Sequence, residues 1–262
     1  MTSPITTTTN ATKPMSALIG HRGLPSQAPE NTAASLKAAF EQGIDWIEVD
    51  VTMAGDGSLV ILHDADLRRF GQPDRTLASL DRAALLQVDA GGWFHAEFAG
   101  EPILFMTQLL TLVRRYRLGL NLELKINPDL AMPEQVDAVI EALRPAALDP
   151  SKLVVSSFDH RALTRLRQRW PEVAIGILFG ALPVDLPAVL IALKPVSIHC
   201  DQALLTAPLA AKIVPLYPLY CYTVNDSVTL ATLLSWGVSG VFSDRAGAEE
   251  LRQVVLDRTL TR

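Results

Sequence analysis

Short apolar runs alternate with amphipathic segments along almost the whole chain. Eight apolar runs predict strands, at 17–20, 46–53, 119–125, 153–157, 174–179, 195–199, 219–224 and 239–243. Helical periodicity is clearest between them, at 31–42, 133–145, 159–169 and 227–236. This alternation is typical of parallel α/β folds, and eight strands favour a closed (β/α)8 TIM barrel. An open doubly wound sheet is the competing prediction, because periodicity does not show closure.

One region interrupts the alternation after the second predicted strand. Residues 56–63, DGSLVILH, read as a turn and a short strand, and 64–112 form an irregular excursion that is too long for a plain loop. We interpret 64–112 as a small insertion on the barrel rim. The Thr-rich residues 1–15 predict a disordered tail, which leaves 16–262 as a single barrel domain.

The second strand carries acids on one of its faces. Side chains alternate across a strand, so Glu48 and Asp50 in DWIEVDVTM share a face with Trp46, while the other face is apolar. A salt-bridged structural pair would explain one lone carboxylate. Two carboxylates that repel each other in a partly buried place need a shared proton or a cation.

The third strand repeats this arrangement. In LGLNLELKIN, Asn121, Glu123 and Lys125 share one face. Glu48, Asp50 and Glu123 together offer three oxygen ligands, which suit a hard divalent cation, Mg²⁺ or Ca²⁺. A zinc site would more often contain His or Cys. The pair of segments therefore favours a metal site over a structural role.

Two histidines lie at the ends of apolar runs near these acids. His21 ends the first predicted strand and His63 ends the short strand after the second. A single such histidine is usually a satisfied polar residue, but two beside a carboxylate cluster can act as general acid and base. Of the remaining histidines, only His199 ends a strand and could reach the mouth of the barrel.

Two cations accompany the predicted site. Arg22 offers a planar fork that matches phosphate oxygens, and Lys125 offers a point charge. They favour an anionic group, most simply a phosphate, although either cation could instead neutralise the carboxylates. In APENT, Asn31 predicts a helix N-cap, and Glu30 could position neighbouring groups in the site.

Composition narrows the possible partners. The 262-residue chain is 49% hydrophobic with a net charge of −5, which argues against nucleic acid or an anionic membrane as the main partner.

The two cysteines, Cys200 and Cys221, predict ordinary thiols in a reducing compartment. The sequence contains no long apolar run, no secretory signal pattern and no nucleotide-binding glycine fingerprint. We expect a cytoplasmic protein without stable membrane insertion. Nothing in the sequence indicates its oligomeric state.

These motifs, in this order, resemble the glycerophosphodiester phosphodiesterase family. The similarity includes the HRG, PENT, ExD, HD and ELK elements, and continues weakly through VVSSFDHRAL, CYTVND and GVSGVFSD to residue 246. The resemblance implies a (β/α)8 barrel with its site at the carboxyl ends of the strands. It implies metal ligation by Glu48, Asp50 and Glu123, acid–base work by His21 and His63, and phosphate binding by Arg22 and Lys125.

The implied reaction is metal-dependent hydrolysis of a small glycerophosphodiester, such as glycerophosphocholine or glycerophosphoethanolamine, to sn-glycerol 3-phosphate and an alcohol. The chain departs from the family pattern at Tyr222, where Trp is common, at 104–108 (LFMTQ), and at 68–76 (RRFGQPDRT). These departures affect the rim and the preferred alcohol. Two alternatives stay open: a lysophospholipase D-like activity on single-chain lipids, helped by the aromatic GGWFHAEF segment, and a barrel that binds phosphodiesters without turnover.

Overall fold

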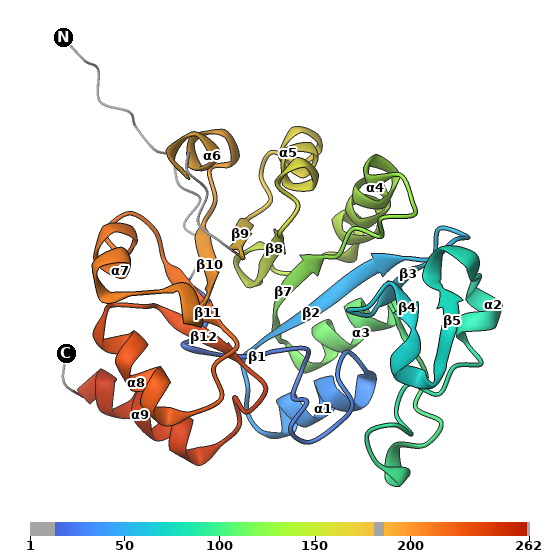
Figure 1. The fold of residues 1–262 in the computed structure, drawn as a ribbon, viewed down its shortest axis with the longest axis horizontal. Coiled ribbons are helices and arrows are strands. Elements are labelled where there is room, and N and C mark those ends of the chain that lie inside the picture. Colours follow the sequence, from blue (N-terminus) through green and yellow to red (C-terminus); the bar gives the residue numbers. More distant parts are fainter. Residues whose placement is uncertain (1–13, 181–185, 261–262) are drawn as a thin grey trace.

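The computed structural model describes residues 14–180 and 186–260, and its centre is a closed parallel barrel (Figure 1). The first strand pairs with both the last strand and the second, where Gly20 lies in register with Ile47. This closure confirms the (β/α)8 TIM barrel and rules out the open sheet. The barrel strands are β1 (Leu18–Gly20), β2 (Trp46–Met53), β7 (Gly119–Leu124), β8 (Leu153–Ser157), β9 (Ile175–Phe179), β10 (Ser197–Asp201), β11 (Leu219–Tyr222) and β12 (Gly240–Ser243).

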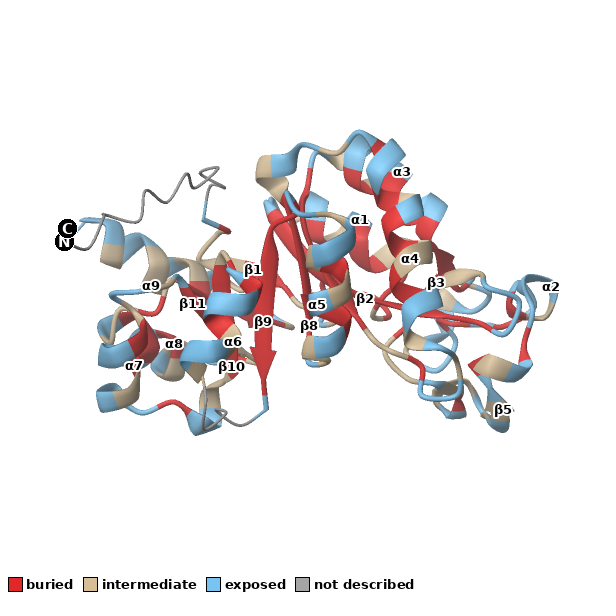
Figure 2. Ribbon diagram, turned by 90° about the horizontal axis from the view of Figure 1, so that it is seen from above, coloured by how far each residue is buried: buried red, intermediate tan, exposed pale blue. Residues whose placement is uncertain are grey.

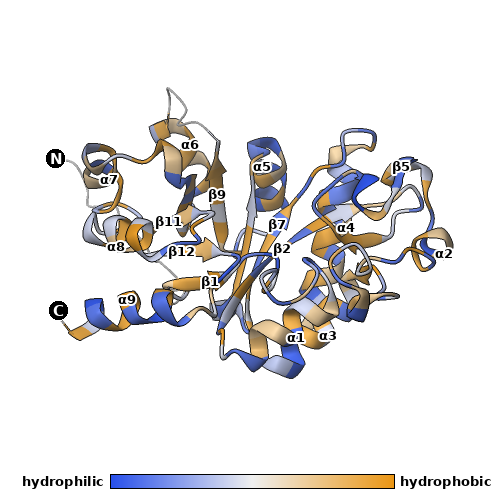
Figure 3. Ribbon diagram, turned by 60° about the horizontal axis from the view of Figure 1, so that its bottom comes forward, coloured by the Kyte–Doolittle hydropathy of each residue, from blue (hydrophilic) through white to orange (hydrophobic). Residues whose placement is uncertain are grey.

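Helices surround the barrel and bury their apolar sides against it (Figure 2). In α3, the buried residues Met106, Leu109, Leu110 and Val113 follow the spacing of one helix face. Figure 3 shows that α9 is more hydrophilic, and Leu251 is its buried position. No helix within the described ranges is long and apolar enough to cross a lipid bilayer. The surrounding helices are α1 (Ala33–Glu41), α3 (Met106–Tyr116), α4 (Met132–Leu143), α5 (His160–Arg169), α6 (Leu186–Leu193), α7 (Ala207–Ile213), α8 (Ser227–Ser235) and α9 (Glu249–Leu260).

An apolar cluster fills the amino-terminal half of the barrel interior. We call it the interior plug, and it contains Met15, Ile19, Trp46, Val154, Ala174, Tyr220 and Phe242. The Tyr220 hydroxyl donates a hydrogen bond to the Met15 carbonyl (3.0 Å), which fastens the start of the chain to this plug. The predicted disordered tail spans 1–15, and residues 1–13 of it lie outside the described residues. The prediction is wrong at Met15, which is buried.

The excursion after β2 forms a lobe at one side of the barrel (Figure 1). Its first strand, β3 (Leu59–Ile61), pairs antiparallel with β2, and β6 (Leu104–Phe105) pairs antiparallel with β3. The range 64–112 extends too far, because α3 begins at Met106 and belongs to the helices around the barrel. The lobe has its own apolar cluster, which includes Leu67 and Leu77. Its other elements are β4 (Asp66–Leu67), η1 (Arg68–Phe70), β5 (Gln72–Thr76), η2 (Leu77–Ser79), α2 (Arg82–Leu85) and η3 (Ala96–Phe98).

The remaining short helices connect barrel units; they are η4 (Arg144–Ala146), η5 (Pro150–Lys152) and η6 (Gln202–Leu204). The predicted cap of α1 is wrong by one residue. Thr32 is the N-cap and accepts a hydrogen bond from the Ser35 amide, while Asn31 has a left-handed backbone (φ 58°) and turns its side chain to Asp50. The Asn31 side chain therefore binds Asp50 instead of capping the helix, which is the role that the sequence pattern predicts for it.

Candidate active site

A cavity of about 170 Å³ lies at the carboxyl-terminal half of the barrel interior, above the plug. All seven residues predicted to form the site line this cavity, so the fold brings them together from β2, β7 and the segments after β1, β3 and β7. The complete lining is His21, Arg22, Glu48, Asp50, His63, Asn121, Glu123, Lys125, Phe158, Leu178, His199, Tyr222, Thr223 and Phe242.

Three carboxylates form the centre of the site. Glu48, Asp50 and Glu123 are buried, with exposed fractions of 3%, 1% and 7%. Asp50 lies in register with Glu123 on the neighbouring parallel strand, and each of the three residues offers an oxygen within 4.8 Å of the other two. The alternation of side chains along β2 and β7 directs all three into the barrel, as predicted.

The electrostatics of these acids are unbalanced. Burial, together with repulsion from Asp50 and Glu123, raises the pKa of Glu48 well above its ordinary value. Burial and the charge of Asp50 raise the pKa of Glu123 to about 7. Burial also disfavours the charge on Asp50, but Lys125 and Arg22 outweigh it and lower the pKa of Asp50. The nearby cations therefore outweigh the cost of burial and repulsion at Asp50, but not at Glu48 or Glu123.

The donor set fits a hard divalent cation. The Glu48 Oε1 atom is buried without a hydrogen-bond partner among the described residues. Such an atom beside two further carboxylates is what an oxygen-ligated cation would satisfy. Lys125 partly replaces that charge: its Nζ lies 2.5 Å from an oxygen of Glu123 and 3.5 Å from Asp50. Arg22 Nε lies 3.4 Å from Asp50.

His21 is held by an acid from the other end of the chain. Its Nδ1 lies 2.7 Å from the Asp244 carboxylate, and Asn225 donates to the second oxygen of that carboxylate (2.8 Å). Burial alone would raise the pKa of Asp244, but the hydrogen bond and charge of His21 lower it. This contact places a proton on Nδ1 and leaves Nε2, 3.9 Å from Glu48, free to accept one.

His63 is held in the same way by its neighbour. Its Nδ1 lies 2.8 Å from Asp64, and Arg69 of the lobe donates to the other Asp64 oxygen (3.2 Å). Arg69 also donates to Glu30 (3.1 Å), which accepts a second hydrogen bond from Arg22 (2.6 Å). Through Glu30, Arg69 of the lobe thus connects Arg22 with Asp64, the partner of His63.

A strained turn places Arg22 after β1. Its backbone is left-handed (φ 52°), a conformation that a non-glycine residue adopts at some energetic cost. The Arg22 amide donates to the Glu48 carboxylate (3.0 Å), which helps to hold this conformation. Gly23 is required next to it, because a Cβ there would lie 2.3 Å from the Ser35 hydroxyl oxygen.

Aromatic side chains form the outer wall of the cavity. Phe158 is 43% exposed and meets Tyr222 edge to face, with ring centroids 5.8 Å apart. The Tyr222 hydroxyl donates to the Phe179 carbonyl (2.8 Å), so the ring that replaces the family's usual Trp is fixed in place. Trp93 of the GGWFHAEF segment packs against Arg69 instead of lining the cavity.

The match to known proteins covers nearly all of this architecture. The model of the Glycerophosphoryl diester phosphodiesterase family matches residues 21–248, from the first site histidine to beyond Asp244. The chain belongs to this family. It is therefore a phosphoric diester hydrolase, a glycerophosphodiester phosphodiesterase.

Curated and solved relatives agree with this membership. A glycerophosphodiester phosphodiesterase of Caldanaerobacter subterraneus is 27% identical over 236 residues, covering 87% of this chain and 93% of that protein. A phosphodiesterase structure from Oleispira antarctica, in complex with the product sn-glycerol-3-phosphate, is 34% identical, with a TM-score of 0.85 over 92% of this chain and 97% of that chain. A structure from Silicibacter pomeroyi, 23% identical with a TM-score of 0.82, shares the fold.

Several residues around the family motifs were missed by sequence reasoning. Asp244, Asn225 and Arg69 support the two histidines and Arg22. Asp244 and Asn225 follow the ends of β12 and β11, in GVSGVFSD and CYTVND, so polar residues directly after a barrel strand were the available signal. His95 and His160 do not line the cavity, whereas His199 does.

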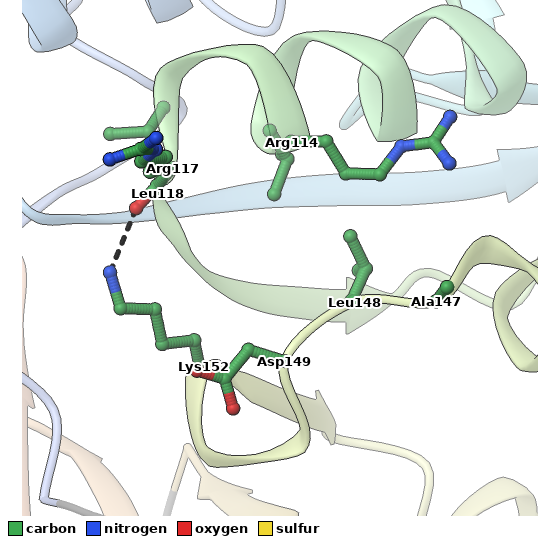
Figure 4. Close-up of a pocket in the computed structure, with 8 residues that line it drawn as sticks. Arg114, Arg117, Leu118, Ala147, Leu148, Asp149 and Lys152 are labelled. Carbon is green, nitrogen blue, oxygen red and sulfur yellow. Dashed lines mark hydrogen bonds between the residues drawn. The ribbon is translucent and has the colours of Figure 1, made fainter.

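A second, larger cavity of about 290 Å³ lies at the other end of the barrel (Figure 4). Arg114, Arg117 and Lys152 surround it, and Lys152 donates to the Arg117 carbonyl (2.8 Å). It contains neither histidine nor paired carboxylates, and barrel enzymes of this type use the opposite end for catalysis. The chemistry of the family therefore belongs to the cavity above the plug.

Proposed function

We propose that the protein hydrolyses small glycerophosphodiesters, such as glycerophosphocholine and glycerophosphoethanolamine, to sn-glycerol 3-phosphate and an alcohol. The main support is the arrangement of two histidines, each bonded at Nδ1 to a carboxylate, in one cavity with three buried acids. A protein that only binds a phosphodiester has no use for such a pair. The arrangement therefore favours turnover over binding alone.

Glu48, Asp50 and Glu123 would hold a divalent metal, Mg²⁺ or Ca²⁺. When bound, this ion supplies positive charge that stabilises the charge developing on the phosphate oxygens. A bound ion would also offset the burial and repulsion that raise the pKa values of Glu48 and Glu123.

His21 and His63 divide the proton transfers. One accepts the proton of the attacking hydroxyl at Nε2, as the new phosphorus–oxygen bond forms. The other gives its proton to the departing oxygen, as the bond from phosphorus to the alcohol breaks. Asp244 and Asp64 hold the two rings in the required orientation through their contacts with Nδ1, which leaves each Nε2 for the transfer. The attacking hydroxyl belongs either to water or to the substrate's own glycerol, with water then opening a cyclic phosphate.

Arg22 and Lys125 would bind the phosphate. Both already contact carboxylates at the centre of the site, so each is positioned at the edge of the place where an anion would approach. The alternative role, neutralising the acids, predicts that loss of Lys125 affects metal binding more than substrate binding. We place the reaction in the cytoplasm, where Cys200 and Cys221, whose sulfur atoms lie 3.8 Å apart on β10 and β11, would stay reduced.

A lysophospholipase D-like activity is the second candidate. The observation that favours it is the exposed Phe158 at the cavity wall, which could contact an apolar chain. In this reaction the protein would release choline from a lysolipid rather than from glycerophosphocholine.

The experiment that tests the proposal measures sn-glycerol 3-phosphate release from glycerophosphocholine with Mg²⁺, with Ca²⁺ and with chelator. We expect release that the chelator abolishes and that His21→Ala and His63→Ala each reduce by about 10²–10⁴-fold. Choline release is measured in parallel from glycerophosphocholine and from lysophosphatidylcholine, because cleavage of the lysolipid yields choline and lysophosphatidic acid rather than sn-glycerol 3-phosphate. Release from the lysolipid alone would favour the second candidate, and binding of glycerophosphocholine without any product would favour a non-catalytic barrel.

A further inference from the structure

Two polar atoms at the bottom of the active-site cavity have no partner. His199 Nδ1 and Asn121 Oδ1 are buried and accept or donate no hydrogen bond among the described residues. Both residues line the cavity, with exposed fractions of 0% and 1%. A buried polar atom without a partner costs about 1–3 kcal/mol, so a ligand that supplies hydrogen-bonding groups here is favoured.

Each side chain is held by a hydrogen bond at its other polar atom. His199 Nε2 lies 2.8 Å from the Ser197 hydroxyl, and Asn121 Nδ2 donates to the Ser156 hydroxyl (2.9 Å). Ser197 lies two residues earlier on the same face of β10, towards the plug. His199 lines the cavity, and Nδ1 is the ring nitrogen that the bond to Ser197 leaves without a partner among the described residues. Gly176 leaves the space for this ring, since a Cβ there would lie 2.5 Å from His199 Cε1.

The two residues lie at the boundary between the interior plug and the carboxylates. Asn121 is in register with Val154, and His199 is in register with Tyr220; both partners belong to the plug. We call Asn121 and His199 the cavity floor. Asn121 is also in register with Glu48, so the floor lies level with this acid and one step below the pair Asp50 and Glu123, and the plug closes the interior beneath it.

The floor is polar but uncharged. Burial lowers the pKa of His199 to about 3, so its ring is neutral at ordinary pH, and Asn121 carries no charge. Neither residue would attract the phosphate, which has Arg22 and Lys125 above it. A hydroxyl group suits both atoms, because it can donate to an amide oxygen and can either donate to or accept from an imidazole nitrogen.

We propose that Asn121 and His199 recognise the free hydroxyl groups at the glycerol end of the substrate and thereby determine its specificity. This rests on the proposed hydrolysis of glycerophosphodiesters in the same cavity. The glycerol end then points down to the floor and the alcohol end points outward, towards Phe158 and Tyr222. A fatty acyl chain attached to the glycerol has no space beyond the floor, so the floor favours glycerophosphodiesters over lysolipids.

The test compares two ligands that differ only in these hydroxyls. Binding of sn-glycerol 3-phosphate and of propyl phosphate is measured by calorimetry on the Mg²⁺- or Ca²⁺-loaded protein. We expect the wild type to bind sn-glycerol 3-phosphate at least about 10-fold more tightly, the size of one or two hydrogen bonds to groups otherwise unpaired. In His199→Phe this preference falls to less than about 3-fold, mainly through weaker binding of the hydroxylated ligand. His199→Asn, which keeps a polar atom near the Nδ1 position, restores part of it.

Tyr220→Phe is the matched control, because it changes a buried ring beside His199 that does not line the cavity. It should keep the full preference. Asn121→Leu tests the floor from another wall if His199→Phe does not fold. A wild type that binds both ligands equally, or a His199→Phe variant that weakens both equally, overturns the proposal. A wild type that binds neither ligand and releases no product points instead to failure of the proposed function.

Discussion

The two halves of the barrel interior are built from the same strands but differ in chemistry: the lower half is apolar, and the upper half holds buried charges. Along one face of β2, Trp46 packs into the apolar plug, whereas Glu48 and Asp50, two and four residues later, meet a third buried acid. The plug gains stability by removing apolar surface from water. The upper half instead concentrates like charges and polar atoms that lack partners.

This difference separates the part of the interior that stabilises the protein from the part that carries its chemistry. Tyr220, at the level of the floor, still donates to Met15 below it, so the lower half is internally satisfied. The upper half is satisfied only in part, by Lys125, Arg22 and Asn31 around Asp50. Changes in the upper half should therefore alter activity strongly, and changes in the lower half should mainly alter stability.

The largest expected effect comes from a change of charge in the upper half. Glu48→Gln should lower kcat/KM on glycerophosphocholine by at least about 10³-fold, because a bound metal contributes several kcal/mol to transition-state stabilisation. Calorimetric titration with Mg²⁺ or Ca²⁺ should show the corresponding loss of affinity. Glu141→Gln, an exposed acid on α4, is the control and should keep both properties. Normal metal binding in Glu48→Gln would contradict the assigned ligand set.

The lower half should show the opposite pattern. Trp46→Ala, which removes a side chain that is 5% exposed, should lower the free energy of unfolding by about 3–5 kcal/mol. The kcat/KM of the remaining folded protein should change by less than about 3-fold. Urea denaturation and initial rates measure the two quantities. Leu216→Ala, at a side chain that is 71% exposed, should cost less than about 0.5 kcal/mol. A large loss of kcat/KM in Trp46→Ala would mean that the two halves are not separable.

A smaller effect on kcat/KM is expected for Asp244, which holds His21 in the upper half of the barrel. Asp244→Ala should lower kcat/KM by about 10–100-fold, less than loss of His21 itself, because the ring stays but its tautomer is no longer fixed. The loss should lie mainly in kcat, with KM changed by less than about 3-fold, because Asp244 contacts the His21 ring and not the residues proposed to bind the phosphate. Asp244→Asn, which keeps one hydrogen-bond acceptor, should lie between wild type and Asp244→Ala. An unchanged kcat in Asp244→Ala would leave Asp244 with a structural role only.

The smallest effect concerns the stability of the metal-free protein. The pKa of Glu123 in the folded state is raised to about 7, so the folded protein holds a proton that the unfolded chain releases. This contribution to the free energy of unfolding falls as pH rises from about 4.5 to about 7. In chelator, the free energy of unfolding of Glu123→Gln relative to wild type should therefore rise by about 1–3 kcal/mol across that pH range. This difference should shrink when metal is added.

That comparison with Glu123→Gln is needed because His199 has the opposite slope. Its pKa is lowered from 6.5 to about 3, so its contribution to stability rises with pH over part of the same range. Urea denaturation of both proteins at a series of pH values removes the contribution of His199, which is common to them, and leaves that of Glu123 together with its repulsion of Glu48. A constant difference between the two curves would refute the raised pKa.

Sequence reasoning predicted the eight strands and the seven central residues because both depend on local spacing. The i, i+2 pattern of Glu48 and Asp50 already determines that they share a face of β2. The supporting residues depend on contacts that spacing does not contain. Asp244 lies 223 residues from His21 and becomes its neighbour only when β12 closes the barrel against β1. Sequence spacing predicts Asn31 as a helix cap because a capping pattern is local. Its hydrogen bond to Asp50, 19 residues away, is not part of such a pattern.

The hydrogen bonds of Glu30 have a consequence for the exchange of parts between relatives. Glu30 accepts from Arg22 of the barrel and from Arg69 of the lobe, so one carboxylate belongs to both. A lobe grafted from another barrel without an arginine at this place would leave Glu30 half-paired and release Asp64 from its second donor. The lobe is therefore not an independent module, because its Arg69 and the loop after β1 have to match at Glu30.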